Sequence, residues 1–277
     1  MGPRSRRFKS CRPDLGRVAR LGLERPLQRQ VLLTVKYPTP KDGRARGDDL
    51  ERLLRAIVHD DRVSARKSLE KDPGLCTGLV DPARLYESKI VHWLYANDTA
   101  LHMAAAGHRV VIARMLLAAG ADPNSARNHR NSRPLHYAAD GYIRNPSFSA
   151  AQQVKTMRCL LHAGADLRAA DKNGATALHH AVRTRCAAAV ECLLQAGADP
   201  TAQNHPGATP FHLAAQNTGH GGSGDPAAKA AQRRIIESML AHKVSPRMKD
   251  ARGKSVLDWA TSEWVRQLLS GSAARNG

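Results

Sequence analysis

An all-α solenoid of repeated helix pairs is the fold class that the 277-residue sequence predicts, and three observations lead to it. A phrase of the type Thr-Pro-Leu-His occurs four times, at Thr99–His102, Arg133–His136, Thr176–His179 and Thr209–His212. A Leu-Leu-x-x-Gly-Ala-Asp phrase follows three of these, at Leu116–Asp122, Leu160–Asp166 and Leu193–Asp199. The starts lie 34, 43 and 33 residues apart, which indicates a unit of about 33 residues with insertions. Each unit can bury its apolar face only against a copy of itself, so we expect the units to stack.

The same phrases predict where the helices of each unit begin and end. Thr at the start of a phrase is expected to be an N-cap whose side chain accepts a hydrogen bond from a free amide. Pro134 and Pro210 fall at the first helical position, where a missing N–H costs nothing. The second helix of a unit is expected to end near a glycine in the left-handed conformation, at Gly120, Gly164 and Gly197.

Both ends of the stack differ from the repeat. Residues 48–59 and 62–70 have leucine and isoleucine at helical spacing and predict a helical N-terminal cap at about 48–74. A long connection, 75–97, follows the cap. A degenerate phrase at Ser255–Asp258 begins a truncated fifth unit, as expected where a core must be closed against water.

The Thr-Pro-Leu-His signature, its partner phrase and the period together resemble the ankyrin repeat. The resemblance covers roughly residues 48–270, with repeats starting near 94, 128, 171, 204 and 250. It implies an all-α ankyrin-repeat solenoid with short β-turn fingers, an N-terminal helical cap and a truncated C-terminal repeat. It also implies a scaffold for protein–protein interaction.

Positive charge is concentrated at the start of the chain. The net charge is +19, and residues 1–47 contain 13 Lys and Arg against 3 Asp and Glu. With little periodicity, residues 1–47 are expected to be a disordered basic arm, and 271–277 a disordered tail. The alternative function for the arm is electrostatic binding of nucleic acid or of another anionic ligand.

Composition and motifs argue against membrane insertion and catalysis. No apolar run approaches the roughly 20 residues of a membrane span, and the start lacks a secretory h-region. The five cysteines form no Cys-x-x-Cys pair, so we expect a cytoplasmic protein. No hydrolase, metalloprotease or phosphate-loop motif is found, so we predict a protein that is not an enzyme and needs no cofactor. The phrase histidines are about 10 Å apart in a stack, too far to share one zinc ion, so no metal site is expected and they are assigned to hydrogen bonds between units.

The expected binding surface follows from the resemblance. Partner contacts are expected at finger tips and at exposed positions of the first helices. These positions are polar and basic, which predicts an acidic protein partner. They are Tyr95, His129, Arg130, Asp140, Lys172, Arg183, His205, Gln216 and Arg252.

The two insertions suggest a second site. They fall between the two helices of the second and fourth units, around 141–151 and 218–230, and the third unit between them has none. Two raised loops would then enclose a notch with Arg183, Arg185 and Cys186 as its floor. The arginines would favour a carboxylate or phosphate ligand, or would lower the pKa of the Cys186 thiol. The expected walls are Asp140, Tyr142 and Arg144 on one side and Gln216, Asn217 and His220 on the other.

Overall fold

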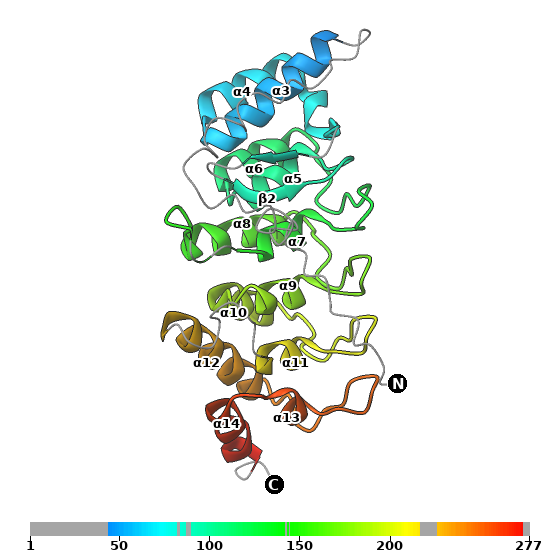
Figure 1. Cartoon of the computed structure of the whole chain (residues 1–277). Helices are drawn as coiled ribbons and strands as arrows, with labels where there is room; N and C mark the ends of the chain where they lie inside the picture. The colour runs from blue at the N-terminus through cyan, green and yellow to red at the C-terminus, as the bar shows by residue number, and fades with distance from the viewer. Residues whose placement is uncertain are drawn as a thin grey trace, which may run out of the picture.

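Helix pairs stacked in a single row make up the described part of the chain (Figure 1). The structure is a computed structural model that describes residues 44–81, 84–86, 90–141, 143, 145–216 and 226–273. The predicted basic arm (apart from its last residues) and the end of the predicted tail lie outside these residues. So do Tyr142, Arg144, Asn217 and His220 of the expected notch walls.

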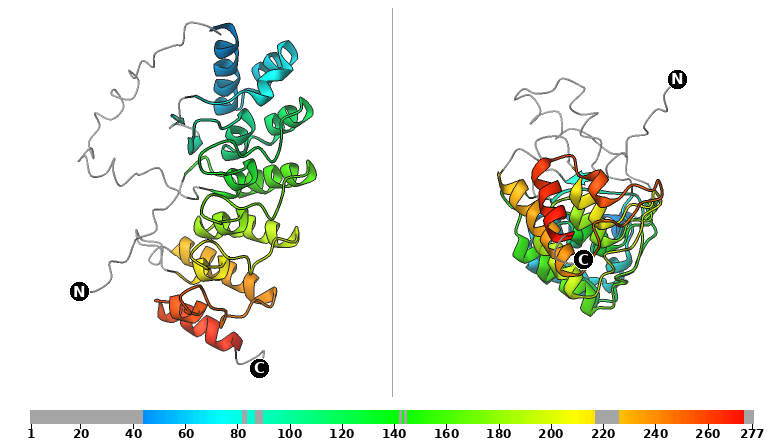
Figure 2. Two further views of the ribbon diagram at one scale, coloured as in Figure 1. Left: turned by 90° about the vertical axis from the view of Figure 1, so that its right-hand side faces the viewer. Right: turned by 90° about the horizontal axis from the view of Figure 1, so that it is seen from below.

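Five units follow one another along the row, each with a first and a second helix. The pairs are α5 (Ala100–Ala106) and α6 (Val110–Ala118), α7 (Pro134–Ala139) and α8 (Ala150–His162), α9 (Ala177–Arg183) and α10 (Ala187–Gln195), α11 (Pro210–Ala215) and α12 (Pro226–Ala241), and α13 (Val256–Trp259) and α14 (Glu263–Ala273). First helices pack on first helices and second helices on second helices, which gives two layers. Seen along the stack, the pairs lie over one another (Figure 2). The predicted solenoid is confirmed.

Small residues allow the first helices to approach closely. Ala104, Ala138 and Ala214 have no exposed surface, and neither do the leucines Leu116, Leu160 and Leu193 of the second layer. Fully burying one such leucine contributes about 1.5–3 kcal/mol. The core is therefore continuous along the stack and consists mainly of alanine and leucine.

The cap continues both layers at one end. It consists of α3 (Arg44–His59), α4 (Arg62–Lys71) and a 3₁₀ turn, Pro73–Thr77. Helix α4 begins where Asp61 accepts a hydrogen bond from the Ser64 amide at 3.0 Å. Helix α3 packs on α5, and α4 packs on α6, so the predicted cap lies where a preceding unit would lie.

Tight turns, here called fingers, connect each second helix to the next first helix. The fingers of units 2 to 5 are residues 121–132, 165–175, 198–208 and 244–254. The predicted left-handed glycines are confirmed, with φ of +98° at Gly120, +86° at Gly164 and +89° at Gly197. Unit 1 has a β-hairpin before it instead of a simple finger. Its strands, β1 (Arg84–Tyr86) and β2 (Ile90–Leu94), pair antiparallel, with Arg84 opposite Leu94.

Candidate partner-binding groove

A histidine in each of units 1 to 4 links that unit to the next finger. The side-chain Nε2 of His102, His136, His179 and His212 lies 3.1 to 3.2 Å from a carbonyl oxygen of Ser132, Ala169, Ala208 and Lys254 respectively. This confirms the predicted role of the phrase histidines. The other nitrogen, Nδ1, accepts the backbone N–H at the start of the same helix, at 3.0 to 3.2 Å.

These histidines change the expected helix cap. The predicted bond from an amide to the threonine hydroxyl is found at Thr209, at 3.5 Å. At Thr99 and Thr176 the hydroxyl faces the same amide in the looser arrangement of a capping box, without a hydrogen bond of ordinary geometry. There the hydroxyl lies 2.9 Å from histidine Nδ1. Burial lowers the pKa of His179 to about 4, and burial together with the nearby His180 lowers that of His136 to about 3. The imidazoles therefore stay neutral, as an acceptor at Nδ1 and a donor at Nε2 require.

Arg185 does not belong to a notch floor, and that prediction is wrong. The residue is only 6% exposed and has a left-handed backbone, with φ of +61°. Its guanidinium donates to the carbonyl oxygens of Leu213, Ala214 and Gln216 at the end of α11. These carbonyls have no partner inside their own helix, so Arg185 satisfies them from the preceding unit. His108 does the same for α7, with Nε2 3.2 Å from the Ala138 oxygen.

Cys186 is also buried, and the prediction of a reactive thiol is wrong. It is 3% exposed, and a Cβ at Gly141 would lie only 2.5 Å from its sulfur. Burial raises the pKa of the Cys186 thiol to about 11. The insertion at 141–151, which was predicted to form a wall of the notch, therefore starts with a residue, Gly141, that covers Cys186. Of the expected walls, Asp140 and Gln216 lie in the described part, and Tyr142, Arg144, Asn217 and His220 do not.

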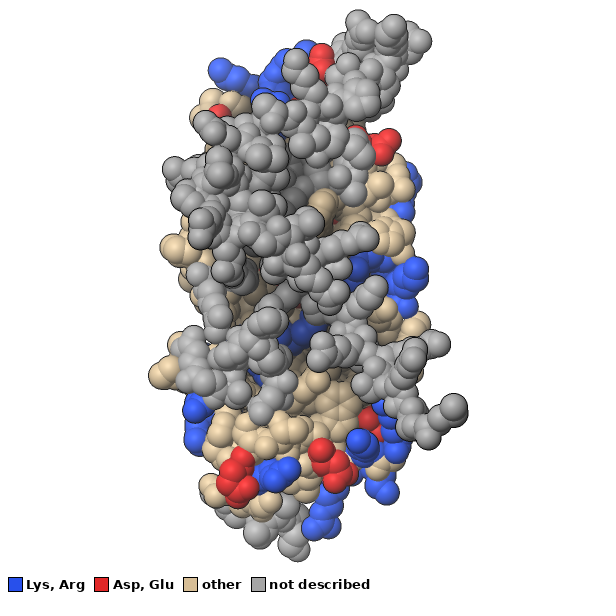
Figure 3. All heavy atoms as spheres, in the orientation of Figure 1, with Lys and Arg blue, Asp and Glu red and all other residues tan. Residues whose placement is uncertain are grey.

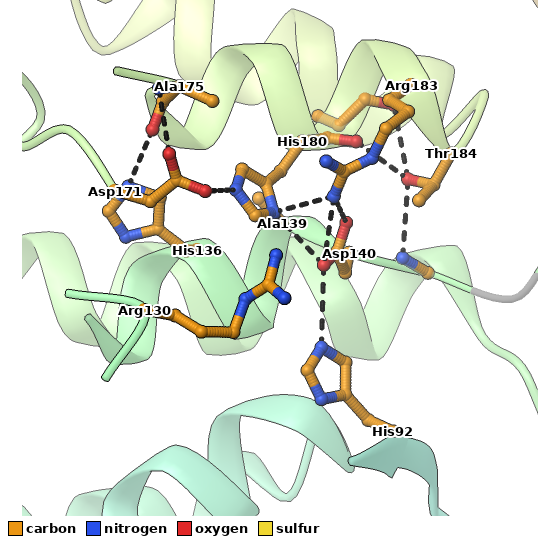
Figure 4. Close-up of polar contacts among 12 residues, drawn as sticks. His92, Arg130, His136, Ala139, Asp140, Asp171, Ala175, His180, Arg183 and Thr184 are labelled. Carbon is orange, nitrogen blue, oxygen red and sulfur yellow. Dashed lines mark hydrogen bonds and ion pairs between the residues drawn. The ribbon is translucent and has the colours of Figure 1, made fainter. Parts of the chain in front are cut away.

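A cluster of charged side chains instead connects three parts of the stack (Figure 4). His180, on α9, lies between two carboxylates. Its Nδ1 is 3.0 Å from Oδ2 of Asp140 at the end of α7, and its Nε2 is 3.3 Å from Oδ2 of Asp171 in the finger of unit 3. Arg183 Nη2 donates to Asp140 Oδ1 at 3.2 Å. The cluster joins units 2 and 3.

The contacts of the cluster determine its protonation. Burial opposes a charge on His180, but Asp140, with help from Asp171, outweighs burial and raises the His180 pKa. Burial would likewise raise the pKa of Asp140, yet His180 and Arg183 hold it well below its usual range. The pKa of Asp171 is lowered by His180 and by the amides of Ala175 and Asn173, against the effect of burial. The net direction favours the protonated form of His180 between the two carboxylates. Arg183 opposes it, because its Nη2 lies 3.0 Å from the His180 Nδ1.

The β-hairpin covers the N-terminal end of the groove, by which we mean the face where the fingers meet the first helices. His92 of β2 stacks on Tyr137 with ring centres 4.4 Å apart, and its Nε2 lies 3.4 Å from Asp140 Oδ2. Tyr137 in turn donates to Asp98 at 2.6 Å. The sequence pattern missed His92, Asp98 and His180, because each of them occupies a position that varies between units.

Finger tips and exposed first-helix positions form the outer surface of the groove. Tyr95 and Arg130 pack together, with the guanidinium carbon 5.2 Å from the ring centre, and His129 lies edge-on to the same ring. Tyr95 and Arg130 are half-buried near the hairpin, and His129 beside them is exposed. The remaining predicted groove residues on the fingers and α11 are exposed, namely Lys172, His205, Gln216 and Arg252.

Comparison with known proteins agrees with this architecture. A family model described as ankyrin repeats, three copies, matches residues 147–223, and one described as ankyrin repeat matches residues 96–129. No curated protein matches the chain. The stacked pairs and fingers define a helical repeat protein. The chain contains ankyrin repeats, and ankyrin repeats are generally protein–protein interaction modules.

Two further findings concern other classes of function. Within the described residues, no helix is both long enough and apolar enough to cross a membrane. The same residues contain no group of three or more His, Cys, Asp or Glu side chains placed to hold a metal ion.

Proposed function

We propose that this protein is a non-catalytic scaffold whose groove binds an acidic segment of a partner protein. The observation that carries the proposal is an imbalance between carboxylates and cations on this face. Three buried carboxylates on this face, Asp98, Asp140 and Asp171, are already used within the fold, whereas several cations on the finger tips face solvent.

Three carboxylates illustrate the first half of this imbalance. Asp98 accepts bonds from Tyr137, from the Tyr95 amide and from Asn128. Asp140 binds His180 and Arg183, and Asp171 binds His180 and two backbone amides. All three side chains are between 0% and 12% exposed, so they present little negative charge to a partner.

The cations behave differently. Lys172 and Arg252 are exposed on the tips of the fingers of units 3 and 5, and no ion pair of either is found within the described residues. A face of this kind attracts acidic segments and speeds their encounter at low ionic strength. Because hydrogen bonds fix the fingers to one another, little ordering entropy is lost on binding.

Site-directed cross-linking tests the proposal. A photoreactive benzophenone amino acid would replace His205, which is exposed in the groove, in the full-length chain. The matched variant would place the same group at Lys155, which is exposed on α8 in the other layer. We expect an acidic protein from cell lysate to be captured at His205 and not at Lys155, and capture to fall when Lys172 is also changed to Glu. Equal capture at the two positions, or capture of a basic protein, would contradict the proposal.

A further inference from the structure

The charge of the fingers is uneven. The fingers of units 2, 3 and 4 have net charges of +1, 0 and −1, counting Lys and Arg against Asp and Glu. The finger of unit 5 has four cations and one carboxylate, a net charge of +3. Its cations are Arg247, Lys249, Arg252 and Lys254, all exposed. In Figure 3, lysine and arginine atoms are prominent at the lower right, over the loop that precedes α13 in Figure 1.

The one carboxylate of this finger, Asp250, forms no ion pair with these cations, because both of its oxygens accept other hydrogen bonds. Its Oδ1 accepts the amides of Arg252 and Lys254, both at 2.9 Å, and its Oδ2 accepts the indole N–H of Trp259 at 3.1 Å. Within the described residues, none of the four cationic side chains makes an ion pair or a hydrogen bond. The carboxylate thus shapes the finger and pairs with none of the four cations. A second carboxylate, the exposed Asp258 of α13, has its pKa lowered by its hydrogen bonds with Ser255 and also by Lys254 and Lys249, but within the described residues it forms no ion pair with either lysine.

One side of the unit 5 finger is uncovered, unlike the same side of the fingers before it. A Cβ at Gly174 would lie 2.8 Å from the His205 amide nitrogen, and one at Gly207 would lie 2.3 Å from that of Ala251. Each of these glycines is thus covered by the next finger. At Gly253, no atom of the described chain lies within 4 Å of such a Cβ.

Lys254 lies on this uncovered side. The equivalent residues of units 3 and 4 are Ala175 and Ala208, which the next finger buries to 6% and 0% exposure. In unit 5 the same position holds an exposed lysine. A long cation therefore occupies the position where units 2, 3 and 4 have a small buried side chain, Ser132, Ala175 and Ala208.

The uncovered side also offers a backbone acceptor. In units 2 and 3 the next finger donates an amide to the finger tip, from Lys172 to the Arg130 oxygen at 2.7 Å and from His205 to the Asn173 oxygen at 2.9 Å. Arg252 holds the equivalent place in unit 5. Among the described residues, no amide donates to its carbonyl oxygen.

We propose that an extended acidic segment of the partner protein adds to the unit 5 finger in the place of a sixth finger. Its backbone N–H would donate to the Arg252 oxygen, and its carboxylates would pair with Lys249, Arg252 and Lys254. Carboxylates at alternate positions of an extended chain point to one side, about 7 Å apart. This inference rests on the proposed function and specifies where on the stack the acidic segment binds.

A peptide fits this site better than a nucleic acid does. Residues 242–255 contain no Phe, Trp or Tyr, so the finger offers no platform on which bases could stack. The open glycine and the carbonyl acceptor suit close approach of a peptide backbone. Phosphodiester oxygens, in contrast, cannot donate a hydrogen bond to that carbonyl.

Fluorescence anisotropy with the full-length chain tests the inference. The probe is a labelled peptide of alternating Glu and Thr, and the comparison variant is Lys249→Glu/Lys254→Glu. A second double, Arg168→Glu/Lys172→Glu, changes the charge equally in the finger of unit 3 and tests the wider groove. Arg66→Glu/Lys67→Glu on α4, outside the groove, is the matched control. We expect the first variant to bind about tenfold more weakly, because two exposed attractions become repulsions. A probe N-methylated at alternate amides should lose affinity for the parent chain, because it cannot donate to the Arg252 oxygen.

Each other outcome overturns the inference in a distinct way. Equal weakening in all three doubles would indicate unspecific attraction to a basic protein. Loss only in the unit 3 double would leave the proposed groove function intact and remove the unit 5 site. Full affinity of the N-methylated probe would rule out addition of a strand. Tighter binding of a duplex or single-stranded oligonucleotide, lost in the unit 5 double, would assign the finger to nucleic acid. Failure of any acidic peptide to bind the parent chain would overturn the proposed function as well.

Discussion

His180 Nδ1 lies 3.0 Å from Asp140 Oδ2, and this contact joins the first helix of unit 3 to the end of the first helix of unit 2. The same carboxylate binds Arg183 and lies 3.4 Å from His92 of the hairpin. A single aspartate therefore holds together two repeats and the segment that covers the groove. Its removal would take one of two carboxylates from His180 and the Asp140 ion pair from Arg183.

Asp140→Asn is expected to destabilise the stack strongly. The amide has the same shape but no charge, so His180 and Arg183 lose their common counter-ion in a site where burial already disfavours charge. Breaking a buried pair from one side costs about 3–5 kcal/mol. The shift of the urea unfolding midpoint measures this. Glu237→Gln, an equal charge change at an exposed site on α12, is the control and should shift the midpoint little. Similar midpoints for both variants would show that the cluster contributes little.

Acid is expected to unfold the protein at milder pH than carboxylate protonation requires. The pKa values of His108 and His179 are lowered to about 4 and that of His136 to about 3, in each case chiefly by burial. Below about pH 6.5 the unfolded chain binds protons that these folded imidazoles exclude. Stability therefore falls as the pH falls, by up to about 1.4 kcal/mol per unit for each histidine.

The pH range in which stability is measured separates the contribution of the buried neutral histidines from that of the charged cluster. The His180 pKa is raised, so its contribution is fully present below the unfolded value and is lost only as the pH rises. Asp140 and Asp171 have lowered pKa values and lose their contribution only nearer to about pH 4. Urea midpoints at about pH 6.5 and about pH 5 should therefore report the neutral histidines. His179→Asn should reduce the difference between the two midpoints, and His205→Asn, at an exposed site, should not. A pH-independent midpoint would contradict the prediction.

The contacts between neighbouring units could be predicted from the sequence because they repeat. The Thr-Pro-Leu-His phrase recurs at a fixed distance from the next finger, so a histidine such as His179 meets an equivalent carbonyl in each unit. The glycines that end the second helices were predictable for the same reason. Local rules for caps and turns sufficed there, since each element and its partner belong to the repeated pattern.

The charged cluster could not be predicted in the same way. His92 comes from a hairpin that belongs to no repeat, and its contact with Asp140 depends on how that hairpin folds back. The prediction of a notch is wrong because of one backbone dihedral angle, the positive φ of Arg185. With this φ the Arg185 side chain points into the next unit. The sequence did contain one signal, because His108 in unit 1 occupies the place equivalent to that of Arg185. In the structure His108 also has a positive φ, of +53°.

Cys186 is expected to react slowly in the folded protein. With a pKa raised from 9.0 to about 11, the fraction of thiolate near neutral pH is about 100-fold lower than in an unperturbed thiol, and burial restricts access further. Iodoacetamide labelling followed by peptide mass spectrometry measures the rate at this one residue. The unfolded chain in urea provides the reference rate. Equal rates in the folded and unfolded protein would restore the notch as a candidate site.

Two glycines in successive fingers should respond differently to the same substitution. Both have a left-handed backbone, with φ of +76° at Gly207 and +73° at Gly253, so alanine introduces a similar backbone strain of about 1–2 kcal/mol at each. At Gly207 the new methyl group would also lie 2.3 Å from the Ala251 amide nitrogen, whereas at Gly253 it would meet nothing. Gly207→Ala should therefore force the fingers of units 4 and 5 apart and cost clearly more stability. Thermal unfolding of the two variants measures the difference. Because the backbone strain is shared, that difference reports the contact between the fingers, and equal unfolding temperatures would show that the unit 5 finger is not held by the one before it.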